Sequence, residues 1–138
     1  MQQLKQILIE SGCSLVIRNQ QAQISQYTQR GVKDLLHLLE NQPDILVGAQ
    51  IADKVVGKGA AALMVIGKVK QLHAITISQP AVDLLLNYSV QLTFDNLVPS
   101  IQNRAKNGLC PIETACIGCQ TAQECLPIIK QTLANLNG

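Results

Sequence analysis

The chain has 138 residues and a mass of 14.9 kDa, and we expect residues 1–138 to form one domain with its own hydrophobic core. Hydrophobic residues make up 47% of it, aromatic residues 2%, and the formal net charge is +2. Nucleic-acid modules stack bases on aromatic rings and neutralise phosphates with basic side chains, so this composition argues against a nucleic-acid partner. No stretch has the length and apolarity of a membrane span or the form of a signal peptide, and we expect a cytoplasmic protein with free thiols.

Apolar spacing and turn residues predict helices and strands in alternation along most of the chain. By residue number, the predicted elements are a helix over 1–10, hairpin strands over 14–18 and 22–27, a helix from 31 that ends before 43, a strand over 45–52, a helix over 54–66, a strand over 72–77, a helix from 78 and a strand over 90–94. This order predicts an α/β fold with three layers, α/β/α, around a mixed sheet that is mostly parallel after the hairpin.

The strand over 45–52 and the helix that follows it are central to this prediction. A continuous apolar run of strand length is typical of a strand covered on both faces of a sheet. Asp53 comes directly after the run, and its carboxylate can accept a first-turn amide hydrogen bond as the N-cap of the helix over 54–66. Small residues in that helix would let it lie close to the sheet.

The last third of the sequence has a less regular pattern. Pro99 can open a short helical turn over 99–103, and Pro111 fits the first position of another short helix. Thr121 begins a capping-box pattern, but Pro127 disfavours a helix interior there. We therefore expect the final helix to begin near Leu126.

The first candidate site is the stretch over 52–59. Lys54 and Lys58 are four residues apart, so they share one face of the predicted helix, next to first-turn amides that attract anions. A P-loop would need glycine in place of Ala52 and serine or threonine in place of Gly59, so this stretch is not a P-loop. The alternative interpretation is a capped helix with solvated lysines and glycines that allow close packing.

The second candidate is Cys110, which precedes Pro111 at a helix start. The helix dipole and the free amides there stabilise a thiolate. Glu113 lies three residues further on, where it can complete a helix cap or act as an acid or base. The alternative is a buried or capping thiol without chemistry.

The third candidate is the C-x-x-C pair Cys116 and Cys119, with Cys110 and Cys125 nearby. Zinc sites usually need a second such pair or histidine partners at set spacing, and both are missing. We therefore predict no cofactor and keep zinc at Cys116 and Cys119, or a redox module built on these thiols, as an alternative.

Several motifs together resemble one family. They are ADKVVGKGAAA at 52–62, SQP at 78–80, LVP-x-I at 97–101, NR at 103–104 and GLCPIE at 108–113. They resemble the DUF1893 family, which has no known function, and the resemblance extends to about residue 115. One departure is Gly59, where the family pattern has alanine. The resemblance implies a cytidine deaminase-like fold, and it implies nothing for Cys116, Cys119 or Cys125.

The implied fold also allows a negative conclusion. Zinc deaminases carry H-x-E at one helix start and P-C-x-x-C at the next. The corresponding places here hold Ala52-Asp53-Lys54 and residues 80–84 (PAVDL), which contain no zinc ligand of those motifs. We therefore predict that the protein is not a zinc-dependent cytidine deaminase.

The resemblance implies a pocket bordered by the stretch over 53–58 and the Cys110 motif. We expect it to bind a phosphorylated nucleotide or an ADP-ribose-like molecule. Its expected ligand-binding residues are Asp53, Lys54, Gly57, Lys58, Asn103 and Arg104. The lysines would contact phosphate, and Asp53 a ribose hydroxyl.

Other functions remain open. One is an enzyme that uses Cys110 as nucleophile, with Glu113 or Lys54 carrying the proton. Others are the cysteine-based metal or redox module and an interaction protein without catalysis. A homo-oligomer is implied by the resemblance alone.

Overall fold

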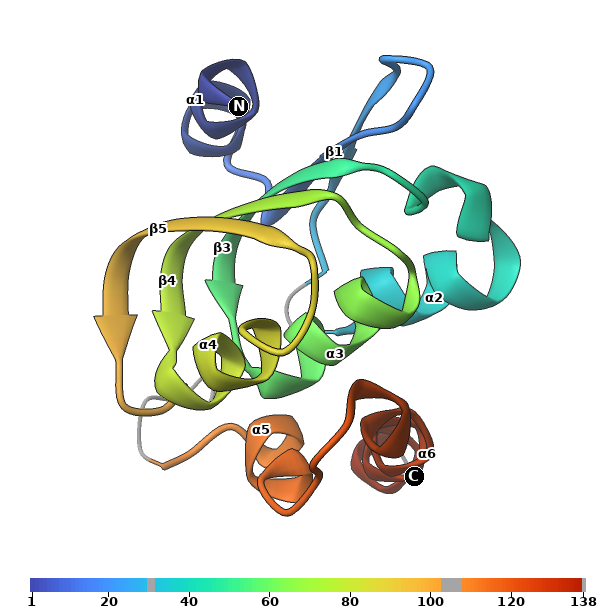
Figure 1. Ribbon diagram of the computed structural model, residues 1–138, viewed down its shortest axis with the longest axis vertical. Coiled ribbons are helices and arrows are strands. Elements are labelled where there is room, and N and C mark those ends of the chain that lie inside the picture. Colours follow the sequence, from blue (N-terminus) through green and yellow to red (C-terminus); the bar gives the residue numbers. More distant parts are fainter. Residues whose placement is uncertain (30–31, 103–107, 138) are drawn as a thin grey trace.

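The computed structural model describes residues 1–29, 32–102 and 108–137, and its chain path is shown in Figure 1. The elements are α1 (Gln2–Ser11), β1 (Leu15–Arg18), β2 (Ile24–Tyr27), α2 (Lys33–Asn41), the 3₁₀ turn η1 (Pro43–Ile45), β3 (Gln50–Val56), α3 (Lys58–Ile66), β4 (Gln71–Ser78), α4 (Gln79–Leu85), β5 (Gln91–Val98), α5 (Pro111–Cys116) and α6 (Ala122–Asn137).

The strands form one five-stranded mixed sheet in the order β2-β1-β3-β4-β5. β1 pairs antiparallel with β2 and with β3, whereas β3, β4 and β5 run parallel. The predicted hairpin and the parallel arrangement after it are therefore confirmed. Because β3 and β4 are parallel neighbours, the helices that follow them, α3 and α4, begin at the same edge of the sheet (Figure 1).

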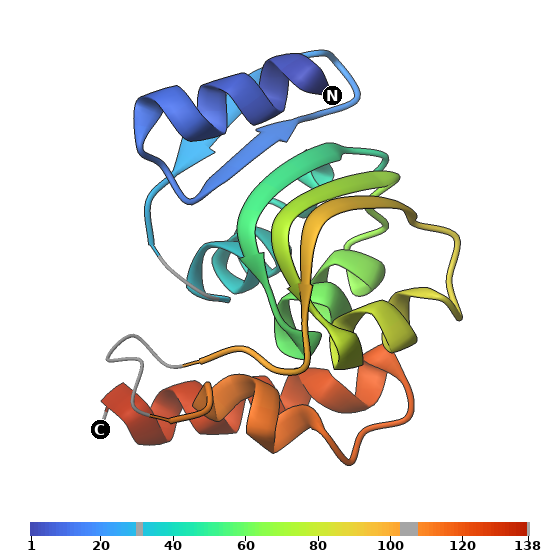
Figure 2. The ribbon, with the colours of Figure 1, turned by 90° about the vertical axis from the view of Figure 1, so that its left-hand side faces the viewer.

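Helices cover both faces of the sheet (Figure 2). Helix α1 lies on one face, where Leu4 and Leu8 pack against Val16 of β1 and Ala52 of β3. Helices α2, α3 and α4 lie on the other face, and α5 and α6 pack against α3 farther from the sheet. The described residues thus form a mixed α/β fold with six α-helices, and the main core is almost entirely aliphatic.

The predicted boundary between the third strand and its helix is wrong. The stretch over 45–52 begins with the turn η1, and β3 runs from Gln50 to Val56. Asp53 is thus a strand residue, paired with Leu15 on one side and Ala74 on the other, and it caps no helix. Hydrogen-bonded pairing with β1 and β4 continues β3 past Asp53, although Asp53 resembles a capping residue. The β-branched residues Val55 and Val56 were the local sequence signal that the strand continues.

Helix α6 also differs from its prediction. It begins at Ala122, and the Thr121 hydroxyl accepts a hydrogen bond from the Glu124 amide (3.3 Å). Glu124 in turn accepts one from the Gln120 amide (2.9 Å). The capping interactions therefore set the start of the helix, and Pro127 lies inside it on the exposed side.

The segment after β5 is not helical over residues 99–102, contrary to the prediction of a turn over 99–103, whose last residue lies outside the described part. Gln102 instead forms an isolated bridge with Leu109. Among the described residues, no helix is both long and apolar enough to cross a membrane.

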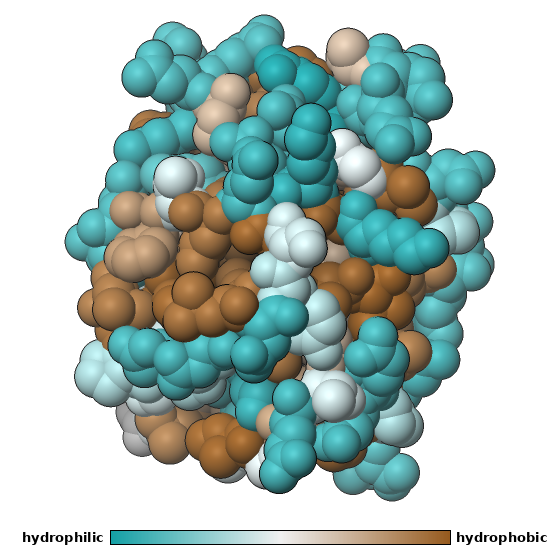
Figure 3. Space-filling model, viewed as in Figure 1, coloured by the Kyte–Doolittle hydropathy of each residue, from teal (hydrophilic) through white to brown (hydrophobic). Residues whose placement is uncertain are grey.

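The low charge of the sequence is visible on the surface. In the view of Figure 3, apolar side chains gather across the middle of the molecule, while the end that carries α1 is mostly polar. Leu86, directly after α4, is 74% exposed.

Candidate functional site

The structure separates the two lysines that the sequence placed on one helix face. Lys54 lies in β3, and Lys58 is the first residue of α3, with Gly57 as the N-cap. They therefore do not share a helix face, and the prediction that they do is wrong. The cause is the later start of α3, because a strand and a helix orient residues four apart in different ways.

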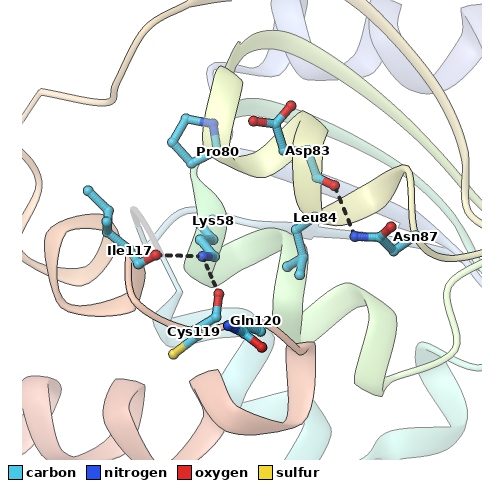
Figure 4. A pocket seen from close by; sticks show the side chains of 8 residues that line it. All are labelled: Lys58, Pro80, Asp83, Leu84, Asn87, Ile117, Cys119 and Gln120. Atoms are coloured by element: carbon cyan, nitrogen blue, oxygen red, sulfur yellow. Dashed lines mark hydrogen bonds between the residues drawn. The ribbon is translucent and has the colours of Figure 1, made fainter.

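Lys58 holds two distant parts of the chain together. Its side chain is largely buried, with 8% of the residue exposed. The ammonium donates hydrogen bonds to the carbonyl oxygens of Ile117 (3.0 Å) and Cys119 (2.6 Å), as Figure 4 shows. Both carbonyls follow the end of α5, so Lys58 fastens the α5–α6 connection to the start of α3.

Glu113 joins the starts of both helices at the sheet edge. Its carboxylate is buried, and Oε2 accepts hydrogen bonds from the Lys58 amide (2.8 Å) and the Ser78 hydroxyl (2.5 Å). Oε1 accepts one from the Ile101 amide (2.8 Å). Ser78 is itself the N-cap of α4 and accepts from the Ala81 amide. An anion does lie at the start of α3, but it is a carboxylate of the chain itself.

Two glycines make this close arrangement sterically feasible. A Cβ atom at Gly57 would lie 3.0 Å from Glu113 Oε2, and one at Gly59 would lie 2.5 Å from Ile112 Cγ2. The resemblance led us to expect alanine at position 59, and the contact with Ile112 accounts for the glycine in this chain. Both glycines therefore serve packing between α3 and α5.

Asp53 lies in the interior of the sheet rather than at a helix start. It is 6% exposed, and burial raises its pKa from 3.8 to about 8, opposed by hydrogen bonds from the Val55 and Lys54 amides. The nearby charge of Asp34 raises the pKa further.

Cys110 has the position that the sequence predicted, as the N-cap of α5, and its side chain is half-buried. Glu113 is three residues away, but its carboxylate accepts the three hydrogen bonds described above. Asn103 and Arg104 lie outside the described residues. The catalytic role of Cys110 stays a prediction.

The other cysteines of the C-terminal part are buried. Cys116, Cys119 and Cys125 belong to the main core, and all five cysteines of the chain are free thiols. Burial raises the pKa of Cys116 to about 11 and raises that of Cys125 still further. Within the described ranges, no three His, Cys, Asp or Glu side chains are arranged to hold a metal ion.

A pocket of about 290 Å³ opens beside the Lys58 ammonium, between α4 and the α5–α6 connection (Figure 4). Its lining residues are Lys58, Pro80, Asp83, Leu84, Asn87, Ile117, Cys119 and Gln120. Of the predicted ligand-binding residues that the structure describes, Lys58 alone lines this pocket. The sequence analysis missed the other lining residues, because they come from two further segments, 80–87 and 117–120, that only tertiary packing brings next to Lys58. The local signal was the SQP motif at the start of α4.

Comparison with known proteins identifies relatives of the whole chain. A family model for TM1506, described as a domain of unknown function (DUF1893), matches residues 3–133. The structure is similar to that of a DUF1893 family protein (TM1506) from Thermotoga maritima, with a TM-score of 0.83 and 25% sequence identity, over 97% of this chain and 88% of that chain. No curated protein matches the chain.

Proposed function

The chain belongs to the DUF1893 family, and we propose that it is a single small-molecule-binding domain whose ligand occupies the pocket beside Lys58. The proposed ligand is a phosphorylated nucleotide or a fragment of that class, such as a sugar phosphate. The observation that carries the proposal is the fixed position of the Lys58 ammonium in the pocket wall.

Lys58 has the right chemistry to receive an anionic group. An ammonium has three N–H donors, and within the described part of the chain two of them are used by the carbonyls of Ile117 and Cys119. The third can donate to a ligand oxygen. Because the backbone amide of Lys58 is already bonded to Glu113, the phosphate would be bound by the side chain rather than by the helix start.

The remaining polar groups of the pocket suit a sugar. Asp83 can accept hydrogen bonds from hydroxyl groups, and the amides of Asn87 and Gln120 can donate and accept. Pro80 and Leu84 supply the apolar surface, and no aromatic ring lines the pocket among the described residues. A base would therefore gain little from stacking, and most of the affinity would come from phosphate and sugar.

The size of the pocket limits the ligand. Pockets for drug-sized ligands typically have volumes of roughly 300–1,000 Å³, and this one has about 290 Å³. We therefore expect a sugar phosphate or one half of an ADP-ribose-like molecule to be enclosed, and the rest of a larger ligand to extend into solvent.

The proposal includes a deaminase-like fold without the zinc chemistry. Since α3 begins later than the sequence suggested, the residues to compare with H-x-E are 57–59 rather than 52–54. Both stretches lack histidine, cysteine and glutamate, and so do residues 80–84 at the start of α4, where Asp83 is the one carboxylate. The argument against a zinc-dependent deaminase therefore holds at the corrected positions.

Titration of the protein with ribose 5-phosphate, AMP and ADP-ribose, followed by calorimetry, tests the proposal. We expect saturable binding that Lys58→Met weakens about tenfold or more, because a hydrogen bond to a charged group contributes about 1.5–3 kcal/mol. The matched control is Lys54→Met, since Lys54 does not line the pocket.

Lys58 also has a structural role, so a second variant is needed. Asp83 is exposed on α4, and Asp83→Ala should fold normally and weaken binding of ligands that carry a sugar. Absence of binding at millimolar ligand would contradict the proposal. So would a loss of affinity in Lys54→Met equal to the loss in Lys58→Met.

A further inference from the structure

The pocket beside Lys58 is built from three segments that are far apart in the sequence. Lys58 comes from the start of α3, residues 80–87 come from α4 and the turn after it, and residues 117–120 belong to the α5–α6 connection (Figure 4). A pocket of this kind keeps its shape only if the three segments hold fixed positions relative to one another. The contacts that fix them are therefore part of the site.

Glu113 touches the first two segments and belongs to the helix that leads into the third. It is a residue of α5, which ends directly before the connection. Its Oε2 atom accepts hydrogen bonds from the Lys58 amide (2.8 Å) and the Ser78 hydroxyl (2.5 Å), and Ser78 is the N-cap of α4. All three segments are thus tied to one carboxylate.

Lys58 is bonded to the region of α5 at both of its ends. Its amide donates to Glu113, and its ammonium donates to the carbonyl oxygens of Ile117 and Cys119. The bond to Glu113 holds the backbone from which the side chain extends, and the two carbonyls hold the tip. The direction of the ammonium in the pocket wall therefore depends on the position of Glu113 as well as on the carbonyls.

Glu113 itself stays outside the pocket. It is 3% exposed, and it is not one of the residues that line the cavity. Its other oxygen, Oε1, accepts a hydrogen bond from the Ile101 amide (2.8 Å), so three donors hold the carboxylate. Such charge-assisted bonds are strong, and breaking them would leave a buried charge without partners.

We propose that Glu113 is a positioning residue of the pocket, which sets ligand affinity by holding the starts of α3 and α4 against α5. It acts through Lys58 and Ser78 and makes no contact with the ligand. The part of this inference that concerns affinity rests on the proposed function, whereas the positioning of Lys58 does not.

Glu113→Ala with added formate tests this role. We expect the affinity for ribose 5-phosphate in calorimetry to fall about tenfold or more, because the Lys58 ammonium loses its fixed position. Sodium formate returns a carboxylate to the space left by the side chain, and it should restore most of the affinity, measured against the wild type in the same salt. Sodium chloride at the same ionic strength should not. Wild-type affinity without formate, or no recovery with it, would overturn the proposal.

Amide hydrogen exchange of the ligand-free protein measures the positioning directly. In Glu113→Ala the amides of Lys58 and Ile101 should exchange about tenfold faster or more, since each loses its acceptor. The amides paired between β3 and β4 should keep their rates. An equal increase at those sheet amides would show a general loss of stability, and it would overturn the positioning role.

Glu113→Gln decides the case in which Glu113→Ala does not fold. The glutamine side chain has one acceptor oxygen in place of two, and we expect this oxygen to face Lys58 and Ser78, where two donors meet. The Ile101 amide should then exchange faster, while the Lys58 amide and the affinity stay close to the wild type. Fast exchange at Lys58 with wild-type affinity, or slow exchange there with lost affinity, would overturn the proposal.

A control and two outcomes keep this inference apart from the proposed function. Glu40→Ala removes an exposed carboxylate that pairs with Lys130 (3.2 Å), and it should change neither the affinity nor the exchange at Lys58. If the wild type and Glu113→Ala bind ribose 5-phosphate equally well, the positioning role fails and the proposed function stands. If the exchange rates change as expected but the wild type binds no ligand, the proposed function fails and Glu113 still positions Lys58.

Discussion

At the start of α3, residues that look functional in the sequence make hydrogen bonds that hold the fold together. Glu113 and Lys58 were both selected from the sequence as chemical groups. In the structure, the Glu113 carboxylate meets the amide of Lys58, and the Lys58 ammonium meets two carbonyls after α5. Buried charges need such partners, because a lone buried charge is very costly.

Gly59→Ala tests the packing of α3 on α5. The added methyl group would lie 2.5 Å from Ile112 Cγ2, so the Ile112 side chain or one of the two helices must shift. We expect the free energy of unfolding in urea to fall by about 1–3 kcal/mol, as in other overpacked cores. Gly118→Ala is the control, since no atom lies within 4 Å of its added Cβ. Equal stability of the two variants would contradict this packing argument.

Asp53 gives stability a defined pH dependence. Its pKa is about 8 in the folded protein and near 3.8 when unfolded, so between these values the folded state holds a proton that the unfolded state has lost. Stability from this group is therefore fully present below about pH 4 and declines as pH rises to about 8.

Urea unfolding of the wild type and of Asp53→Asn at pH 4, 6 and 8 measures this effect. The variant keeps a neutral side chain, so it should gain stability relative to the wild type by up to about 1.4 kcal/mol per pH unit. Asp44→Asn, at an exposed position, should show no such trend. A constant difference between wild type and Asp53→Asn would contradict the buried position of this carboxyl.

At the scale of elements, local sequence signals predicted a boundary correctly where a single capping residue or a single hydrophobic periodicity was present. Helix α1 lies within one residue of its predicted range, α4 begins directly after Ser78, and Pro111 is the first residue of α5, as predicted. The local signals gave the wrong element boundary where two of them competed. Asp53 resembled a cap, but sheet pairing on both sides decided its conformation, and at α6 the Thr121 cap outweighed Pro127.

Thr121→Ala tests the observed start of α6. Loss of an N-cap hydroxyl typically costs about 1 kcal/mol, and we expect this decrease in the free energy of unfolding. Thr114→Ala, at an exposed site within α5, should change stability less. An unchanged stability of Thr121→Ala would instead favour a helix that begins near Leu126.

At the scale of the whole molecule, the sheet separates α1 from the α5–α6 layer (Figure 2). The proposed pocket lies on the side of α5 and α6, between α4 and the α5–α6 connection. Strand β5 forms one edge of the sheet, where Phe94 is 40% and Leu97 47% exposed. The aromatic-poor composition thus matches an aliphatic core, and one of the chain's few rings lies at the surface.

The sequence by itself determined the family, the α/β class and most of the element order, because periodicity, caps and motifs are encoded within a few neighbouring residues. Only the tertiary structure decided where α3 begins, what faces its first amide and which residues line the pocket. The Glu113 carboxylate and the Lys58 amide are 55 residues apart, and no local pattern encodes such a contact. Pairing and packing between distant segments, rather than local preference, therefore determine the geometry of the candidate site.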